Sequence, residues 1–324
     1  MKFIKYVLIF TLLQLLLNVN IFAFEKVGTT SFQFLKVIPT ARAVAMGGAY
    51  STIGVGSESI FWNPAGLTTV SNFDAAVSYL DWFMDATQYS FSAAYKVEGI
   101  GTIGIMGMMA DVGEIKETKV SYLGYQNGVY NPGLTGNTFN PKSIVFGLSY
   151  AKDLNDRFTF GLNLKYAYED LIYYGKGAII FDGGMLFKTG FKSIVVGASI
   201  RNFGQEIIYL DKNYPLPQTL NIGISAYLFS DDNSLFAKLQ DHSLLLSTDI
   251  IQPRDYNQQY AVGLEYSFSK MLYLRSGYLF NDDNKGINLG AGISYKGTNV
   301  DYAFSNHGDF LGSVHRISIS VSLK

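Results

Sequence analysis

The sequence predicts an all-β fold: a fourteen-stranded antiparallel transmembrane β-barrel with an N-terminal plug in its lumen. Three observations predict it. From Phe73 onward, apolar and polar residues alternate in segments about as long as a tilted membrane strand needs to be. The connections between these segments are alternately short and long. The residues before Phe73 have no such alternation and are rich in small residues and turn signals.

The first residues have the pattern of a secretory signal peptide. Two lysines precede an apolar run from Tyr6 to Leu17, and a small residue, Ala23, follows two asparagines. The run is shorter than the roughly 20 residues of a membrane-spanning helix. We therefore expect a signal peptide over residues 1–23 that is cleaved after Ala23. An uncleaved membrane anchor is the alternative.

Residues 24–72 are expected to form the plug. Small side chains let a backbone pack closely against the inner face of a barrel, and a short helix that begins near Thr40 should stop at two glycines. A turn should follow at Asn-Pro-Ala-Gly, because Pro fixes φ and Gly can adopt a positive φ. The residues assigned to the plug and its turn are Arg42, Met46, Gly47, Gly48, Asn63, Pro64, Ala65 and Gly66.

Residues 73–324 are expected to form the barrel. In "RFTFGLNLKYAY" (157–168), large apolar residues occupy every second position, and polar or small residues occupy the others. Strict alternation over such a length indicates a strand with one apolar and one polar face. We expect strands near 73–80, 87–97, 100–110, 142–151, 157–168, 177–188, 192–201, 218–228, 242–251, 258–268, 271–280, 286–295, 298–304 and 313–323.

The connections favour a barrel over a soluble fold. An outer-membrane barrel has short turns at its periplasmic end and long loops at the other end. Two connections depart from this rule, since 229–241 is long for a turn and 81–86 is short for a loop. A soluble β-sandwich or propeller is the alternative, but it has no reason to separate its loops by length. An even strand number places both ends of the barrel domain at the same end, so residues 24–72 and Lys324 should be periplasmic or luminal.

The charged residues of the strands fall mostly on the polar parity, which faces the lumen in a barrel. A charge that faces lipid near the bilayer midplane costs about 2–4 kcal/mol. These residues could line a polar passage, or they could pair with one another and with plug residues such as Arg42 and Glu58. They are Lys96, Lys165, Asp182, Arg201, Asp249, Glu265, Arg275, Asp301 and Arg316.

Composition argues against several classes of function. Lys+Arg 25 against Asp+Glu 26 gives no basic excess, so no nucleic-acid partner is expected. The sequence contains no cysteine (Cys 0), so there can be no disulfide and no thiolate metal site. The three histidines are scattered, and no Gly-x-Ser-x-Gly motif occurs. We expect no enzymatic activity, no metal and no cofactor.

Two regions resemble known outer-membrane proteins. "ARAVAMGGAYSTIGVGSESIFWNPAGL" (41–67) resembles the N-terminal segment of FadL-type proteins, which transport long-chain fatty acids through fourteen-stranded barrels. Together with "LRSGYLF…GINLGAGISYKGTNVDYAF…LGSVHRISISV" (274–321), it is more similar to the PorV/PorQ branch of that superfamily. That resemblance implies an accessory of protein secretion, type IX-like, which binds exported proteins at the cell surface.

The wider FadL-type resemblance implies the alternative function, a channel that takes up hydrophobic small molecules across the cell outer membrane. Loops 111–141 and 202–217 carry aromatic and aliphatic residues that would suit a hydrophobic ligand or a protein partner. They could equally fold over one another as a lid. The expected partners are outer-membrane lipid, secreted proteins or other secretion components, and a hydrophobic small molecule.

Overall fold

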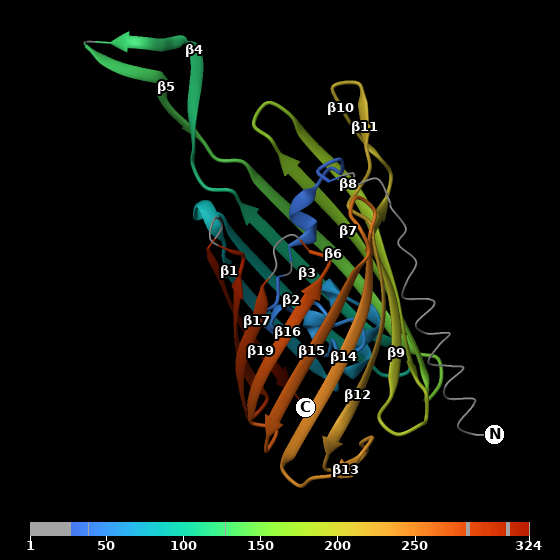
Figure 1. Cartoon of the computed structure of the whole chain (residues 1–324). Coiled ribbons are helices and arrows are strands. Elements are labelled where there is room, and N and C mark those ends of the chain that lie inside the picture. Colours follow the sequence, from blue (N-terminus) through green and yellow to red (C-terminus); the bar gives the residue numbers. More distant parts are fainter. Residues whose placement is uncertain (1–26, 38, 127, 283–285, 309–311, 324) are drawn as a thin grey trace, which may run out of the picture.

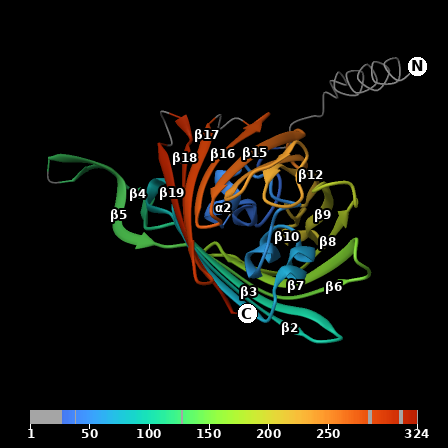
Figure 2. The same ribbon diagram turned by 90° about the horizontal axis from the view of Figure 1, so that it is seen from below.

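The computed structural model describes residues 27–37, 39–126, 128–282, 286–308 and 312–323. Over these residues, fourteen long strands pair with their neighbours in one closed antiparallel ring (Figures 1 and 2). Pairing between β9 and β12 and between β19 and β1 completes the ring. The predicted barrel fold is confirmed. The predicted signal peptide lies outside the described residues.

The barrel strands match the segments expected from the alternation, with most ends shifted by one to three residues. They are β1 (Phe73–Asp81), β2 (Thr87–Val97), β3 (Gly101–Asp111), β6 (Lys142–Asp153), β7 (Phe158–Asp170), β8 (Gly175–Lys188), β9 (Val195–Gly204), β12 (Thr219–Ser230), β14 (His242–Pro253), β15 (Gln259–Phe268), β16 (Leu272–Phe280), β17 (Ile287–Tyr295), β18 (Thr298–Asn306) and β19 (Ser313–Leu323). No helix in the described part of the chain has both the length and the apolar character to cross a bilayer.

Burial alternates along the strands as the sequence pattern requires. The polar face of each strand is turned to the inside of the barrel and is buried, and the apolar face is turned outward. In β7, Leu162 and Leu164 face outward and are exposed, whereas Asn163 and Lys165 face the lumen and are buried. Such an outward apolar surface is stable only where lipid covers it, and the lumen must then satisfy its own polar groups. The barrel therefore has the polarity of a transmembrane protein.

Its two ends differ. At the end that we call the short-turn end, tight connections join the strands, and β1 begins beside the end of β19. At the opposite, long-loop end, residues 112–126 and 128–141 do not fold over the lumen as a loop. They form a hairpin of β4 (Ile115–Gln126) and β5 (Val129–Phe139) that extends beyond the barrel (Figure 1). Two short strands, β10 (Ile207–Tyr209) and β11 (Lys212–Tyr214), form a second hairpin there.

The long turn at the short-turn end also has a structural explanation. β12 pairs with β9 only as far as Ser225, so the rest of that edge of β12 is free of β9. β13 (Ala237–Lys238), within the turn, folds back and pairs with Phe229 and Ser230 of β12. The extra residues therefore cover a strand edge that would otherwise be unpaired.

Residues 29–37 and 39–72, which we call the inner segment, lie inside the barrel (Figure 2). Four short helical elements follow one another along it: η1 (Gln33–Lys36), α2 (Ala41–Ala45), η2 (Ser57–Phe61) and η3 (Pro64–Thr69). Elements this short make only a few backbone hydrogen bonds within themselves, so side chains of the inner segment and of the barrel must satisfy other backbone groups, as Asn63 does for the Ala65 amide.

Candidate functional site

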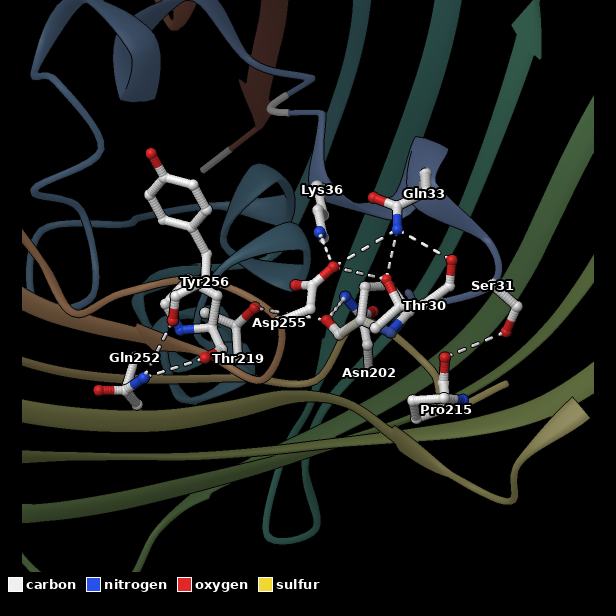
Figure 3. A network of polar contacts seen from close by, with 12 residues as sticks. Thr30, Ser31, Gln33, Lys36, Asn202, Pro215, Thr219, Gln252, Asp255 and Tyr256 are labelled. Carbon is white, nitrogen blue, oxygen red and sulfur yellow. Dashed lines mark hydrogen bonds and ion pairs between the residues drawn. The ribbon is translucent and has the colours of Figure 1, made fainter. Parts of the chain in front are cut away.

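The inner segment contacts both ends of the barrel. At the long-loop end, Lys36 pairs with Asp255, which lies between β14 and β15, and Thr30 Oγ1 donates to the same carboxylate at 2.8 Å (Figure 3). At the short-turn end, the Ser57 amide donates to Asp74 of β1 at 2.7 Å. The chain thus runs through the whole lumen before β1 begins. The expectation that residues 24–72 are periplasmic or luminal is refined: the start of the inner segment is at the long-loop end.

The first part of the inner segment is packed against glycines of the barrel. α2 ends at Ala45 and Met46 caps it, and the two residues that follow, Gly47 and Gly48, have φ values of 65° and 85°. A Cβ on Gly277 of β16 would overlap the backbone of Gly47, and one on Gly263 of β15 would lie 2.6 Å from the Met46 carbonyl oxygen. The missing side chains on both surfaces allow the two backbones to touch.

The Asn-Pro-Ala-Gly stretch makes the next contact. Asn63 Oδ1 accepts from the Ala65 amide at 3.1 Å, and Pro64 is the first residue of η3. Asn63 Nδ2 donates to the Ser51 carbonyl at 2.8 Å within the segment and to the Met185 carbonyl of β8 at 3.1 Å. Here, too, glycines make the room: Cβ atoms on Gly161 and Gly184 would overlap the backbone at Pro64–Ala65 and the Asn63 side chain, respectively.

The role predicted for Gly66 is wrong. Gly66 does not have a positive φ, and the stretch continues as the 3-10 helix η3 instead of closing a turn. Its small size is nevertheless required, because a Cβ would overlap the carbonyl oxygen of Gly54.

An ion-pair network joins the inner segment to the strands. Arg42 contacts Glu265 with both Nε and NH2 at 2.8 Å, and Arg275 contacts Glu265 and Asp301. The Glu265 and Arg275 side chains are almost fully buried. Glu58 of η2 lies near this network. Burial raises the pKa of Glu58 to about 7, and the carboxylates of Asp301 and Asp74 add to the shift.

A second polar network lies in the strands. Lys165 of β7 pairs with Asp182 of β8 at 2.8 Å and donates to Asn202 at 2.7 Å. Near it, Arg201 donates to the Phe61 carbonyl at 3.2 Å, and its guanidinium lies 4.7 Å from the centre of the Trp62 ring. Both networks show buried charge that is paired or hydrogen-bonded, as a filled lumen requires.

The remaining predicted luminal charges are not part of these networks. Asp249 accepts from the Ser51 amide at 2.9 Å, and Arg316 of β19 is buried. Lys96 is exposed at the end of β2, so it lies at the rim of the barrel and not within the lumen.

Several cavities accompany this arrangement in the described part of the chain, and two of them concern the inner segment and the wall of the barrel. A chamber of about 560 Å³ lies at the short-turn end. Arg42 and Arg275 line it, together with Glu58, Asp74 and three tyrosines. An apolar groove of about 510 Å³ lies on the outward face of β1, β2, β3, β6 and β19, where Tyr79, Phe91 and Phe146 line it. Behind the groove, β3 pairs with β2 and with β6, and neither pairing has a register shift. The hydrogen-bonded wall of the barrel is therefore continuous there.

The histidines do not form a catalytic arrangement with serine. His242 and His315 each contact a tyrosine hydroxyl, of Tyr266 and Tyr302, at 2.7 Å on the barrel exterior. Within the described residues, no group of three His, Asp or Glu side chains could hold a metal ion.

Sequence reasoning missed two features. One is the set of inward glycines in β7, β8, β15 and β16, which was visible as Gly on the polar parity of strands. The other is Asp255, which joins a loop to a segment more than 200 residues away in the sequence. Its position in a short, polar loop gave no signal.

Comparisons with known proteins show which solved structures have a similar fold. No family model matches the chain, and no curated relative matches it. Among solved structures, the toluene transporter TbuX of Ralstonia pickettii has a TM-score of 0.60 at 12% identity and covers 89% of this chain and 100% of its own. The CymD monoaromatic hydrocarbon channel has a TM-score of 0.58 at 14% identity, covering 89% of this chain and 98% of its own.

A FadL homologue of Pseudomonas aeruginosa has a TM-score of 0.55 at 10% identity and covers 88% of this chain and 98% of its own. At these identities the likeness shows a shared fold, that of the FadL-type barrels. It agrees with the wider resemblance seen in the sequence. The finer resemblance to PorV/PorQ stays a prediction.

Proposed function

We propose that this protein is an outer-membrane channel that takes up hydrophobic small molecules. The observation that carries the proposal is a closed fourteen-stranded barrel with an inner segment in its lumen, whose fold is that of transporters named for toluene and monoaromatic hydrocarbons. No covalent chemistry is needed. The inner segment acts as the plug, and it moves when a molecule passes.

The absence of native cysteines allows a direct test. Ser57 of the inner segment and Ser92 of β2 are both buried, and their hydroxyl oxygens are 3.0 Å apart. A Ser57→Cys/Ser92→Cys disulfide would fix the inner segment to the barrel. We expect intact cells that carry the oxidised variant in their outer membrane to lose uptake of a hydrophobic probe such as toluene, and a reductant to restore it. Single-cysteine variants are the controls. Uptake that is the same with and without the disulfide would contradict the proposal.

The secretion accessory is the second candidate, and the β4–β5 hairpin favours it. Near the hairpin tip, Tyr125 and Val129 are strongly exposed, and the hairpin pairs with no other strand of the described chain. Such a surface suits a protein partner. Removing residues 114–140 would abolish binding of an exported protein if this candidate is right, and would leave toluene uptake unchanged if the channel is right.

A further inference from the structure

The apolar groove on the outward face of the barrel follows from how its strands pair. Direct cross-strand partners form an outward row across four strands, which consists of Val77, Phe91, Gly107 and Phe146. Gly107 therefore leaves a gap between two phenylalanines. A Cβ on Gly107 would lie 2.1 Å from the Phe91 ring, so this ring lies over the glycine. The gap is the floor of the groove of about 510 Å³.

A second outward row borders the groove toward the long-loop end. Its members are Ile317, Tyr79, Tyr89, Met109 and Ile144. The rings of the two tyrosines are 5.1 Å apart. None of the residues that line the groove is charged. Apart from the two phenol hydroxyls, the side chains that project into this part of the surface are thus apolar.

The groove lies in one half of the membrane. Its outward residues are two and four positions from the long-loop ends of four strands, at Asp81, Thr87, Asp111 and Lys142. At about 3.3 Å per residue, they lie roughly 7–13 Å along the strands from the rim. Half of a hydrocarbon core is about 15 Å thick. The groove therefore faces the leaflet at the long-loop end, and its tyrosines lie near the headgroups, where such rings are enriched.

The surroundings of the groove restrict what can occupy it. The wall behind it is continuous, so an occupant comes from the bilayer and not from the lumen. The groove is also part of the outward surface that lipid covers. A second copy of the barrel would present another convex wall, which would rest on the projecting side chains. The gap at Gly107 would then stay empty and lose its dispersion contacts. A flexible hydrocarbon chain can fill it.

We propose that the groove binds one acyl chain of an outer-leaflet lipid, and that this lipid stays on the barrel while its neighbours exchange. The inference goes beyond uptake and does not depend on it. Above the groove, Asp81 lies opposite His315, and Lys142 contacts Asp111 at 3.3 Å. Groups of both signs are thus present at the rim. The site should therefore select the chain and not the charge of the headgroup.

The test measures lipid binding to two groove variants and two controls. Gly107→Leu fills the gap, and Gly183→Leu adds the same side chain on the outward face of β8, where the nearest atoms to a Cβ are 3.8 Å away. Phe146→Ala removes one wall of the groove. Its control is Phe181→Ala, also on β8, because the two phenylalanines are 56% and 51% exposed. Heat-modifiable gel mobility confirms that each barrel is assembled.

The probe is phosphatidylethanolamine with a diazirine in one acyl chain. Full-length protein, stripped of lipid in a mild detergent, is titrated with the probe and photolysed, and mass spectrometry locates the label. We expect saturation at one lipid per barrel, with the label on β1, β2, β3, β6 and β19. Gly107→Leu and Phe146→Ala should raise the apparent dissociation constant at least tenfold, and the controls should stay within about twofold. A phosphatidylglycerol probe with the same chains should also bind within about twofold.

Three results would overturn the inference. Label that spreads evenly around the outward surface without saturation means that the wall touches only bulk lipid. Equal losses in Gly107→Leu and Gly183→Leu mean that the groove is not the site. Crosslinks between two barrels across these strands, in place of the lipid label, mean that a second copy occupies the groove.

Discussion

Replacing Glu265 should release the inner segment from the strands. Glu265 is the carboxylate shared by Arg42 and Arg275, so Glu265→Leu leaves two guanidinium groups without it. The Arg275 side chain is 3% exposed and that of Arg42 is 15% exposed, which makes this a buried network. Removing one partner of a buried ion pair costs about 3–5 kcal/mol. Because Arg275 keeps Asp301, we expect the lower end of this range.

The structure offers two controls. Glu206 and Arg254 form a pair whose side chains are 45% and 46% exposed, and such a pair contributes about 0–1 kcal/mol, so Glu206→Gln should have little effect. The single variant Glu265→Leu leaves the Arg42 guanidinium without its ion-pair partner. The double variant Arg42→Met/Glu265→Leu removes this guanidinium as well, and Arg275 keeps Asp301. It should be more stable than Glu265→Leu alone, with a coupling free energy of about 0.5–3 kcal/mol.

The assay follows urea unfolding by tryptophan fluorescence in a Trp82→Phe background. Trp62 is then the only tryptophan, and it reports on the inner segment, where it is buried. Gel mobility follows the barrel separately. The reasoning is refuted if Glu265→Leu and Glu206→Gln unfold within about 1 kcal/mol of each other, or if the double variant loses as much as the two single variants together.

Three further changes test the lipid face, the buried carboxyl and the plug. Leu164 faces outward at mid-strand, so Leu164→Arg should destabilise the barrel by about 2–4 kcal/mol. Gel mobility should then show less assembled barrel. Asn288 is on the inward parity, so Asn288→Arg should be tolerated better. For Glu58, the pKa of about 7 in the folded protein exceeds the ordinary 4.5, so docking of the inner segment is strongest at low pH and weakens as the pH rises from about 4.5 to about 7. The loss due to Glu58 should be at most about 3 kcal/mol by Trp62 fluorescence. Glu58→Gln should remove this part and leave the smaller part due to Asp249, a second carboxyl that is buried in the lumen. Deleting residues 41–66 leaves all fourteen strands, so the barrel should still insert and should conduct small polar solutes in a planar bilayer; a closed deletion variant would mean that other elements fill the lumen.

The sequence predicted the barrel well because every strand must satisfy two environments at once. A period of two with lipid on one side and lumen on the other leaves a pattern in each strand that does not depend on its neighbours. The ends of β9 were less well predicted, since both are shifted from the expected 192–201 to Val195–Gly204. They depend on where one strand stops pairing and another segment takes over its edge, which is a property of the assembled sheet.

The lumen could be predicted only in part. Charges on the polar parity indicate a polar interior. The two partners of Glu265, however, come from α2 and from β16, and Arg275 reaches on to Asp301 of β18, so no spacing in the sequence predicts the network. The same holds for Phe32, which is fully buried in the lumen although its φ of 53° lies in the left-handed region. Local propensity favours neither this conformation nor its burial. Positions of this kind become visible only when the inner segment is placed against the strands.

Two neighbouring glycines of β8 separate the role of the inner segment from that of the barrel. Gly184 faces the lumen, where a Cβ would overlap Asn63 Oδ1 and lie 3.1 Å from Pro64 Cδ. Gly183 faces outward, and the nearest atoms to its Cβ would be 3.8 Å away. Valine at either position changes strand propensity equally. Only Gly184→Val should push η3 away from the strands, at about 1–3 kcal/mol for an overpacked contact.

We therefore expect Gly183→Val and Gly184→Val to assemble alike, with the same gel mobility. In Gly184→Val alone, Trp62 fluorescence should shift to the red as its indole becomes hydrated, and planar-bilayer conductance should rise. If both variants keep Trp62 buried and the pore closed, the Asn63–Pro64 contact does not hold the inner segment in place. If both conduct, the effect comes from the strand itself, and the segment is not what closes the lumen.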